Sequence, residues 1–239
     1  MTSVPADLAI PAGLPDWPAW RAFALACGLP ETAFPRLGVL EQFHRDLAEA
    51  NAQHNLTRLT DAADFWIKHV ADSLTAGLAA PGLHTAAWRV ADVGCGAGFP
   101  LIPLAWANPA LAITGIETNG KKTAFLEAET ARLGLGNCHI LARQAREAGR
   151  LPGHQQAYDL VVARAVAEPH LLLRECRALL NPTTGGRLIL FSTPEALAKD
   201  APLLQRETAK FGLVLTHSPP ILLPGQAGAR QFAILGLQK

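Results

Sequence analysis

A glycine-rich turn and an acidic residue stand where two neighbouring strands are expected to end. Asp92 lies in an apolar run, and Gly94, Gly96 and Gly98 follow it at alternate positions. Glycines at such a turn permit positive φ and let a ligand approach the main chain closely. The free N–H groups of the helix start that follows favour a polar or anionic ligand. Glu117 ends the next expected strand, about 20 residues further on, where it could hold the hydroxyls of a ribose.

The spacing of these glycines separates two classes of nucleotide cofactor. A dinucleotide fingerprint, G-x-G-x-x-G, requires glycine where this chain has Phe99, counting from Gly94, or Leu101, counting from Gly96. The spacing D-x-G-x-G-x-G is instead typical of S-adenosylmethionine (SAM) methyltransferases. The sequence therefore predicts SAM as the cofactor and disfavours a nicotinamide dehydrogenase.

Composition limits the class of protein. The 239 residues are 49% hydrophobic and 17% charged, with a net charge of +1, which neither demands nor excludes a nucleic-acid partner. The four cysteines form no C-x-x-C pair, which favours reduced thiols in a cytosolic protein. No apolar run reaches the roughly 20 residues of a membrane span, and the N-terminus lacks the cationic start of a signal peptide. We expect a cytoplasmic monomer with no membrane association and no metal site.

The elements that must position the glycine turn fall into two parts. Residues 1–83 are predicted to be an N-terminal arm and helical extension, and residues 84–239 a SAM-binding domain. In the extension we expect a loosely ordered arm over 1–17 and helices over 18–29, 31–54 and 61–80, the last capped by Asp61.

The second part alternates strands with helices, which predicts an α/β fold with a doubly wound, mostly parallel sheet. This is the Rossmann-like arrangement of class I methyltransferases, with seven strands, and its ligand would lie above the carboxyl ends of the first, second and fourth strands. The expected strands are 88–93, 111–117, 137–142, 158–163, 186–191, 213–217 and 231–237, and the helices are 99–107, 119–134, 168–180 and 194–212.

Three stretches resemble one known family. They are Asn55-Leu56-Thr57 with Lys68-His69-x-x-Asp72-Ser73-Leu74, the glycine turn through Pro100, and Ala163-Arg164-Ala165-x-Ala167 after the fourth strand. Together they resemble the bacterial 16S rRNA guanine-N7 methyltransferase family, also called glucose-inhibited division protein B. The resemblance covers about residues 36–237. It implies a SAM-dependent enzyme that methylates N7 of a guanine in 16S rRNA, either as free rRNA or within the 30S particle.

The resemblance also implies a set of cofactor contacts. They fall on the glycine turn, on the end of the second strand, on a pair after the third strand, and on the arginine after the fourth. In this chain they are Gly94, Gly96, Gly98, Phe99, Glu117, Gln144, Ala145 and Arg164. The pair after the third strand has a second register, Ala145-Arg146, because the family usually has R-x-E where this chain reads Arg143-Gln144-Ala145.

Two further departures from the family pattern bear on the site. Leu101 replaces a usual glycine and could tighten the contact between helix and strand. Phe191-Ser192 replaces a usual Lys-Gly pair at the end of the fifth strand, which removes a cation from the expected RNA side. That loss bears more on RNA affinity than on SAM binding.

Guanine N7 carries an in-plane lone pair and no proton, so its methylation needs alignment rather than a general base. Arg164 is the expected catalytic residue, and it could bind either the methionine carboxylate or a substrate phosphate. Because N7 faces the deep major groove of A-form RNA, the target guanine must lie in an open or distorted segment. The candidate RNA contacts are Arg58, Lys68, Lys121, Lys122, Arg143 and Arg230.

Other functions and simpler roles stand beside these hypotheses. A SAM-dependent methyltransferase for a small molecule or a protein would suit the neutral charge, and a non-catalytic SAM-binding, ribosome-associated module is a third alternative. His69 and Asp72 could equally dock the helix through hydrogen bonds. Asn51 and Asn55 are expected to cap or close a turn. Glu127 and Glu129 are expected to be exposed charges on a helix.

Overall fold

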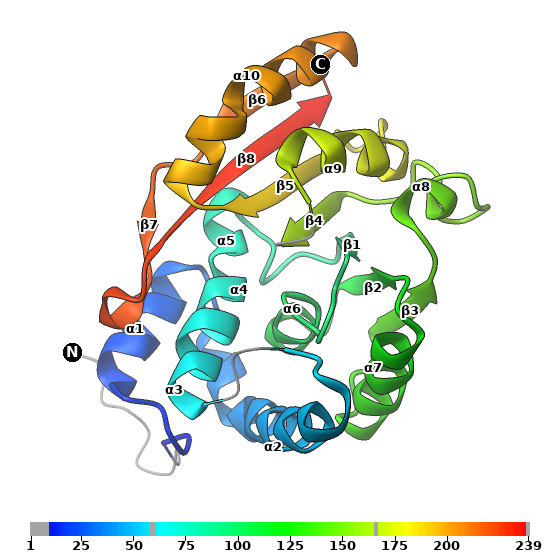
Figure 1. Ribbon diagram of the computed structural model, residues 1–239. Coiled ribbons are helices and arrows are strands. Elements are labelled where there is room, and N and C mark those ends of the chain that lie inside the picture. Colours follow the sequence, from blue (N-terminus) through cyan, green and yellow to red (C-terminus); the bar gives the residue numbers. More distant parts are fainter. Residues whose placement is uncertain (1–9, 58–60, 165–166, 238–239) are drawn as a thin grey trace.

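A computed structural model describes residues 10–57, 61–164 and 167–237 of the chain. Its centre is a twisted sheet in which five strands are parallel (Figure 1). The described strands follow the order β3-β2-β1-β4-β5-β8-β6, with β8 antiparallel to β5 and β6, as the predicted mostly parallel fold requires. The strands are β1 (Arg89–Val93), β2 (Ala112–Glu117), β3 (Cys138–Ala142), β4 (Leu160–Arg164), β5 (Arg187–Ser192), β6 (Leu213–His217), β7 (Ile221–Leu222) and β8 (Ala229–Leu237).

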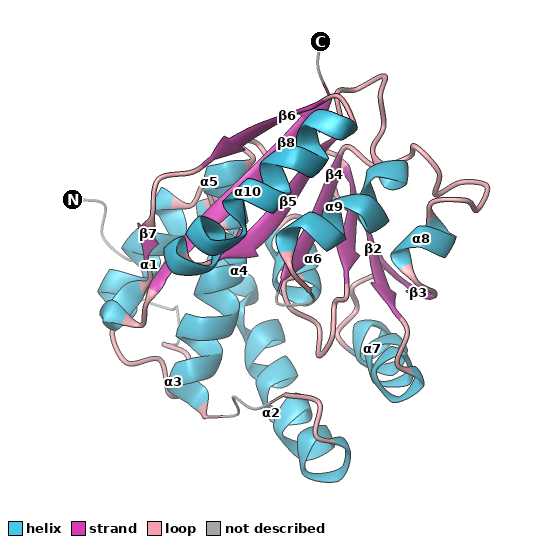
Figure 2. Ribbon diagram, turned by 45° about the horizontal axis from the view of Figure 1, so that its top comes forward, coloured by secondary structure: helices cyan, strands magenta, loops and turns pink. Residues whose placement is uncertain are grey.

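Helices cover both faces of the sheet, so β4 and β5 carry apolar side chains on both of their faces. On β4, Val161 packs with the helices of one face and Val162 with those of the other. Figure 2 shows α9 and α10 together on one face. The helices of this part are α6 (Leu101–Ala107), α7 (Gly120–Arg132), α8 (Ala145–Ala148), α9 (Pro169–Cys176) and α10 (Pro194–Lys210), with short 3-10 turns at Arg177–Leu179 and Pro224–Gln226. The sequence reading missed α8 and the two-residue β7, which are too short for a clear period.

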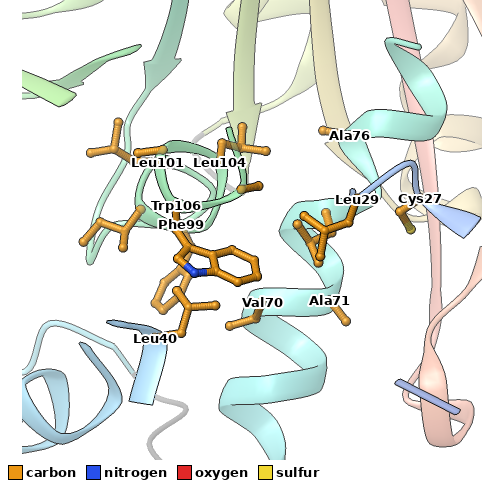
Figure 3. Packing of buried hydrophobic residues seen from close by; sticks show 14 of the residues in the cluster. Cys27, Leu29, Leu40, Val70, Ala71, Ala76, Phe99, Leu101, Leu104 and Trp106 are labelled. Carbon is orange, nitrogen blue, oxygen red and sulfur yellow. The ribbon is translucent and has the colours of Figure 1, made fainter. Parts of the chain in front are cut away.

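The N-terminal helices lie on the face that carries α6 and α7, and they share its hydrophobic core. Figure 3 shows Leu40 and Val70 from these helices beside Phe99 and Trp106 from the segment after β1. Trp106 also donates its indole N–H to the Arg36 carbonyl at 2.8 Å. The division after residue 83 stays a prediction, and the segments on its two sides are joined by one core. The helices are α1 (Trp17–Ala26), a 3-10 turn (Glu31–Arg36), α2 (Leu37–His54), α3 (Ala62–Asp64), a π-helix (Phe65–Ala71), α4 (Asp72–Leu74) and α5 (Ala76–Ala79).

The predicted helix over 61–80 forms as four short pieces rather than one regular helix. Asp61 caps its start, as expected, by accepting a hydrogen bond from the Asp64 amide at 2.9 Å. The next seven residues, Phe65–Ala71, take π-helical turns, which are uncommon and often mark functional sites. Sequence periodicity does not distinguish these wide turns from α-helical ones, because the same side chains still face inward.

Part of the expected loose arm is packed against the helices. Leu14 is buried, the Ala12 amide donates to Glu41 at 2.9 Å, and the indole N–H of Trp66 donates to the Ala12 carbonyl at 3.2 Å. The prediction of loose structure is therefore wrong for residues 10–16, because these backbone groups find partners on α2 and the π-helix. The remainder of the arm, residues 1–9, lies outside the described residues.

Candidate functional site

The glycine turn after β1 places its three glycines in different environments. All three have positive φ, at 68° for Gly94, 58° for Gly96 and 102° for Gly98. Gly94 and Gly96 border a cavity. A Cβ on Gly98 would lie 2.9 Å from Ile102 and 3.2 Å from Phe43 of α2, so this glycine lets the N-terminal helices approach the turn. Gly98 therefore has a packing role, and it does not border the cavity among the described residues.

Asp92 anchors the helix that follows the turn. Its buried carboxylate accepts a hydrogen bond from the Leu101 amide, at the start of α6, at 2.9 Å. Burial raises the pKa of Asp92 to about 7, while the charge of Arg164 and the Leu101 amide act in the opposite direction. The carboxyl group thus fixes the position of α6 relative to β1, and with it the geometry of the turn.

Leu101, one of the departures from the family pattern, packs over a glycine on β2. A Cβ on Gly115 would lie 2.6 Å from the Leu101 side chain and 2.9 Å from the Cys95 sulfur. Leu101 and Cys95 are both buried. The larger side chain on α6 is therefore accommodated by the absence of one on β2, which keeps helix and strand close.

Glu117 ends β2 with its carboxylate directed at main-chain amides. One oxygen accepts from the Gly96 amide at 3.1 Å, and the other from the Thr118 and Asn119 amides at 2.8 and 2.9 Å. These bonds hold the carboxylate beside the glycine turn. The geometry agrees with the predicted position for binding ribose hydroxyls, because a carboxylate oxygen can accept more than one hydrogen bond.

A cavity of about 540 Å³ opens above the carboxyl ends of the parallel strands, a size typical of small-ligand sites. It brings together most of the predicted cofactor residues from four separate segments. Its wall includes Gly94, Gly96, Phe99, Glu117, Gln144, Ala145 and Arg164. Amides, a carboxylate, a guanidinium and apolar side chains converge there, so the residues present fit a nucleoside cofactor with a charged tail.

The segment after β3 forms a tight corner of this cavity. Gln144 caps α8 in a reciprocal capping box with Glu147, whose carboxylate accepts from the Gln144 amide at 3.2 Å. Ala145 is buried and lines the cavity beside Gln144, whereas Arg146 is exposed and does not line it. This placement favours the Gln144-Ala145 register over the Ala145-Arg146 register.

Arg164, at the end of β4, is held by the helical motif of the N-terminal extension. Its Nη1 donates to the Lys68 carbonyl at 3.0 Å and to Asp72 at 2.8 Å, and its Nη2 lies 3.1 Å from Nδ1 of His69. His69 in turn stacks on Phe99, with ring centroids 4.1 Å apart. Two motifs separated by about 90 residues in sequence therefore meet as one hydrogen-bonded unit on the cavity wall.

Arg230, a predicted RNA contact, completes this unit from β8. Its Nε and Nη2 donate to Asp72 at 2.6 and 2.8 Å, and its Nη1 donates to the Ser192 carbonyl at 3.1 Å. The side chain is mostly buried, with 19% of its surface exposed. Arg230 thus places a cation beside Phe191-Ser192, the position where the family's lysine is missing.

The other predicted RNA contacts are scattered around the cavity. Lys122 and Arg143 line it. Lys68 lies on the π-helix with its ammonium 2.6 Å from Asp64, and Lys121 borders a separate groove between α2 and α7. Arg58 lies outside the described residues.

Several cavity residues escaped the sequence analysis. Leu171 and Glu175 lie one turn apart on the same face of α9. Their spacing is a sequence signal, but it points to the cavity only when α9 is known to border it. Leu172 lies on the same helix, and the others belong to recognised motifs or directly adjoin predicted site residues: Leu56, Thr57, Val93, Ile116 and Thr118. Glu129 was expected to be exposed and is buried, because α2 packs over its part of α7. Asn51 behaves as expected, since its side chain accepts from the Thr57 amide at 2.7 Å.

Comparisons with known proteins agree on one group. A profile of the family described as "rRNA small subunit methyltransferase G" (GidB) matches residues 36–201. A protein of this name from Synechococcus sp. strain JA-3-3Ab is 35% identical over 90% of this chain and 83% of its own length. One from Lacticaseibacillus paracasei is 36% identical over 81% of this chain and 79% of its own.

Solved structures support the fold. The crystal structure of a ribosomal protein L11 methylase from Lactobacillus delbrueckii subsp. bulgaricus superimposes with a TM-score of 0.52 at 16% identity, covering 72% of this chain and 79% of that one. At this identity the likeness concerns the fold, which is the Rossmann-like fold of class I methyltransferases. Among the described residues, no helix is long and apolar enough to cross a bilayer.

Proposed function

This chain belongs to the rRNA small subunit methyltransferase G family, and from that premise we propose how its cavity serves the SAM-dependent methylation of guanine N7 in 16S rRNA. The observation that carries the proposal is the junction of Arg164 with Asp72 and His69. It joins the helical motif to the end of β4, directly beside the glycine turn.

The chain's residues bind and orient two ligands. SAM supplies an electrophilic methyl group when bound. Main-chain amides of the turn at Gly94 and Gly96 would face its methionine part, and Glu117 would accept from its ribose hydroxyls. Gln144 and Ala145 would border its base. Because guanine N7 has a lone pair and no proton, no side chain need remove a proton before attack, and alignment is the main contribution.

Arg164 would act from a fixed position. Three hydrogen bonds to Lys68, Asp72 and His69 use three of the five N–H donors of a guanidinium. The other two could bind the methionine carboxylate or a phosphate of the RNA. Since its orientation is already set by the helical motif, Arg164 would bind with little loss of side-chain freedom.

The RNA would approach over the rim of the cavity. Lys122 and Arg143 lie on this rim, and Lys68 lies on the adjoining π-helix. These cations, with Lys121, Arg58 and Arg230 as further candidates, would contact phosphates. The target guanine must lie in an open segment, because side chains do not reach N7 in regular A-form RNA. We propose that the protein acts as a cytoplasmic monomer on 16S rRNA, either as free rRNA or within the 30S particle, which the first test below distinguishes.

Transfer of labelled methyl groups tests this function. SAM with a labelled methyl group would be offered with 30S subunits lacking the modification, with their deproteinised rRNA, and with a small-molecule extract. We expect label at one guanine of 16S rRNA, mapped by cleavage at 7-methylguanosine. Label in the extract but not in RNA would overturn the proposed substrate.

A matched pair of arginine variants tests the role of the junction. Arg164→Ala should retain a folded sheet but lose at least about 100-fold in methyl transfer, as expected when a positioned group at a site is removed. Arg206→Ala, on the exposed face of α10, should leave the rate unchanged. A wild-type rate from Arg164→Ala would exclude it as a catalytic residue.

A further inference from the structure

The cavity wall carries two carboxylates among the described residues, and they differ in how their oxygens are used. Glu117 accepts hydrogen bonds from three main-chain amides. Glu175, on α9, forms no hydrogen bond or ion pair with any residue that the structure describes. A half-buried carboxylate without a partner on a ligand-sized cavity is available to accept a hydrogen bond from the ligand.

Glu175 lines the cavity from the last turn of α9, a part of the wall that we call the α9 corner. Leu171 and Glu175 occupy the same helical face one turn apart, and both line the cavity. Just after α9, Ala178 packs against α8, since a Cβ on Gly149 would lie 2.8 Å from the Ala178 side chain. The end of α9 that carries Glu175 therefore lies beside α8, whose first residue is Ala145.

The strand order determines which part of the cofactor reaches this corner, given the cofactor of the proposed function. Neighbouring strands run β3-β2-β1-β4. With the ribose at Glu117 on β2 and the methionine part at the turn after β1, the base must extend the other way, toward the end of β3. Three buried apolar residues line the cavity, Ile116 of β2, Ala145 of α8 and Leu172 of α9, and they suit the faces of an aromatic ring.

The edge of the base needs polar partners at this corner. Adenine has a single exocyclic hydrogen-bond donor, its N6 amino group. The Gln144 side chain is engaged in the α8 capping box, and Ala145 has no polar side chain. We propose that Glu175 accepts a hydrogen bond from N6 of the cofactor's adenine and thereby selects adenine over hypoxanthine, whose O6 would face the carboxylate with a second acceptor.

Binding of two S-homocysteine nucleosides tests this assignment without any methyl transfer. Dissociation constants for S-adenosylhomocysteine and S-inosylhomocysteine would be measured by calorimetry on the full-length protein. We expect the wild type to prefer the adenosine compound by about tenfold, the effect of one charge-assisted hydrogen bond at a partly exposed site.

Two substitutions of Glu175 should change that ratio in different ways. Glu175→Ala should weaken the adenosine compound about tenfold, whereas the inosine compound should bind as well as before or slightly more tightly, because the repulsion between O6 and the carboxylate is lost. Glu175→Gln should bring the two affinities within about threefold, because an amide can accept from N6 or donate to O6. Glu127→Gln, an exposed change on α7, should keep the wild-type ratio.

An unchanged ratio in both Glu175 variants would overturn the proposal, and so would an equal loss for both compounds, which would indicate a structural role. The proposed RNA substrate and the proposed adenine contact of Glu175 can be rejected independently of each other. Absence of label in rRNA with wild-type protein would reject the RNA substrate, whereas the binding ratio depends only on the base of the cofactor.

Discussion

Two buried acidic junctions connect the N-terminal helices to the rest of the chain, and their charges are balanced in opposite ways. In the first, which we call the Asp72 junction, one carboxylate is shared by two guanidiniums, those of Arg164 and Arg230. In the second, the Glu129 junction, one guanidinium, that of Arg132, serves two carboxylates, Glu129 and Asp46. The first reaches the cavity wall through Arg164, and the second lines the groove between α2 and α7.

The local bonding differs as the charge balance suggests. Both oxygens of Asp72 accept hydrogen bonds, at 2.6 to 2.8 Å. In the Glu129 junction, Oε2 of Glu129 lies 3.5 Å from Arg132, and its buried Oε1 has no partner among the described residues. A buried carboxylate oxygen without a hydrogen-bond partner favours the neutral form of its group, as at Glu129. We infer that the Asp72 junction fixes geometry and that the Glu129 junction responds to pH.

Removal of Asp72 should have the largest effect on stability. Asp72→Ala leaves two mostly buried guanidiniums without a counter-ion, which should lower the free energy of unfolding by about 3 to 5 kcal/mol. Urea denaturation at pH 7 would measure it. Asp64→Ala removes a partly exposed ion pair with Lys68 on the same stretch and should cost about 1 kcal/mol or less. Equal losses in the two variants would contradict the special role of the Asp72 junction.

Substitution of Glu129 should raise the free energy of unfolding, whereas substitution of Asp72 lowers it. This gain should be smaller than the Asp72 loss and should depend on pH. Burial raises the pKa of Glu129 to about 7 from an ordinary value of 4.5. The folded state therefore holds this proton more tightly than the unfolded state. Its stabilising contribution is complete below about pH 4.5 and is lost as the pH rises to about 7.

Glu129→Gln removes that loss, so the variant should be more stable than the wild type at pH 8 and similar to it at pH 4. We expect a gain of about 1 to 2 kcal/mol at pH 8, less than the whole shift would give, because the groove admits water and the contact with Arg132 is forfeited. Thermal unfolding across this pH range would measure it. Glu127→Gln, two residues away and exposed, should show no such trend. A gain that is independent of pH would contradict the protonation argument.

Substitution of Arg132 should change the free energy of unfolding less than substitution of Asp72 or Glu129. The size of its effect should depend on whether Glu129 is present. Arg132→Met leaves Asp46 and Glu129 without their cation, but the arginine side chain is 52% exposed and solvent screens it. We expect a loss of about 1 kcal/mol at pH 8. The loss should shrink in the Glu129→Gln background, since one of the two carboxylates is then absent. Strictly additive effects would show that the two side chains are not coupled.

The same contrast explains what the sequence could predict. The glycine turn, Glu117 and the parallel strands are local patterns, and the fold and most of the cavity wall follow from them. In the Asp72 junction, Arg164 is separated from Asp72 by 92 positions in the sequence and Arg230 by 158 positions. No spacing rule connects Arg230 to Asp72. Arg230 was predicted as an RNA contact because its charge precedes a strand near the site. Its partners in the structure are Asp72 and the Ser192 carbonyl, which only the tertiary fold brings close to it.

Glu129 illustrates the complementary limit. A glutamate in a helix that is rich in polar residues is ordinarily exposed, and only the packing of α2 on α7 buries it. Helix packing of this kind depends on tertiary contacts that periodicity does not reveal. The π-helical turns at Phe65–Ala71 escaped for a similar reason, since their inward-facing residues match a regular helix.

The smallest effect on stability should come from Lys68, which lies at the exposed edge of the Asp72 junction. Its ammonium contacts Asp64 in a partly exposed pair, so Lys68→Ala should change the free energy of unfolding by less than about 0.5 kcal/mol. Its effect should appear in RNA binding instead. If Lys68 contacts a phosphate, the slope of log affinity against log salt concentration should fall by about 0.7 to 0.9. Lys199→Ala, at an exposed position of α10, should leave the slope unchanged. Identical slopes in the two variants would exclude a phosphate contact by Lys68 and leave Lys122 and Arg143, which line the cavity, as the nearest candidates.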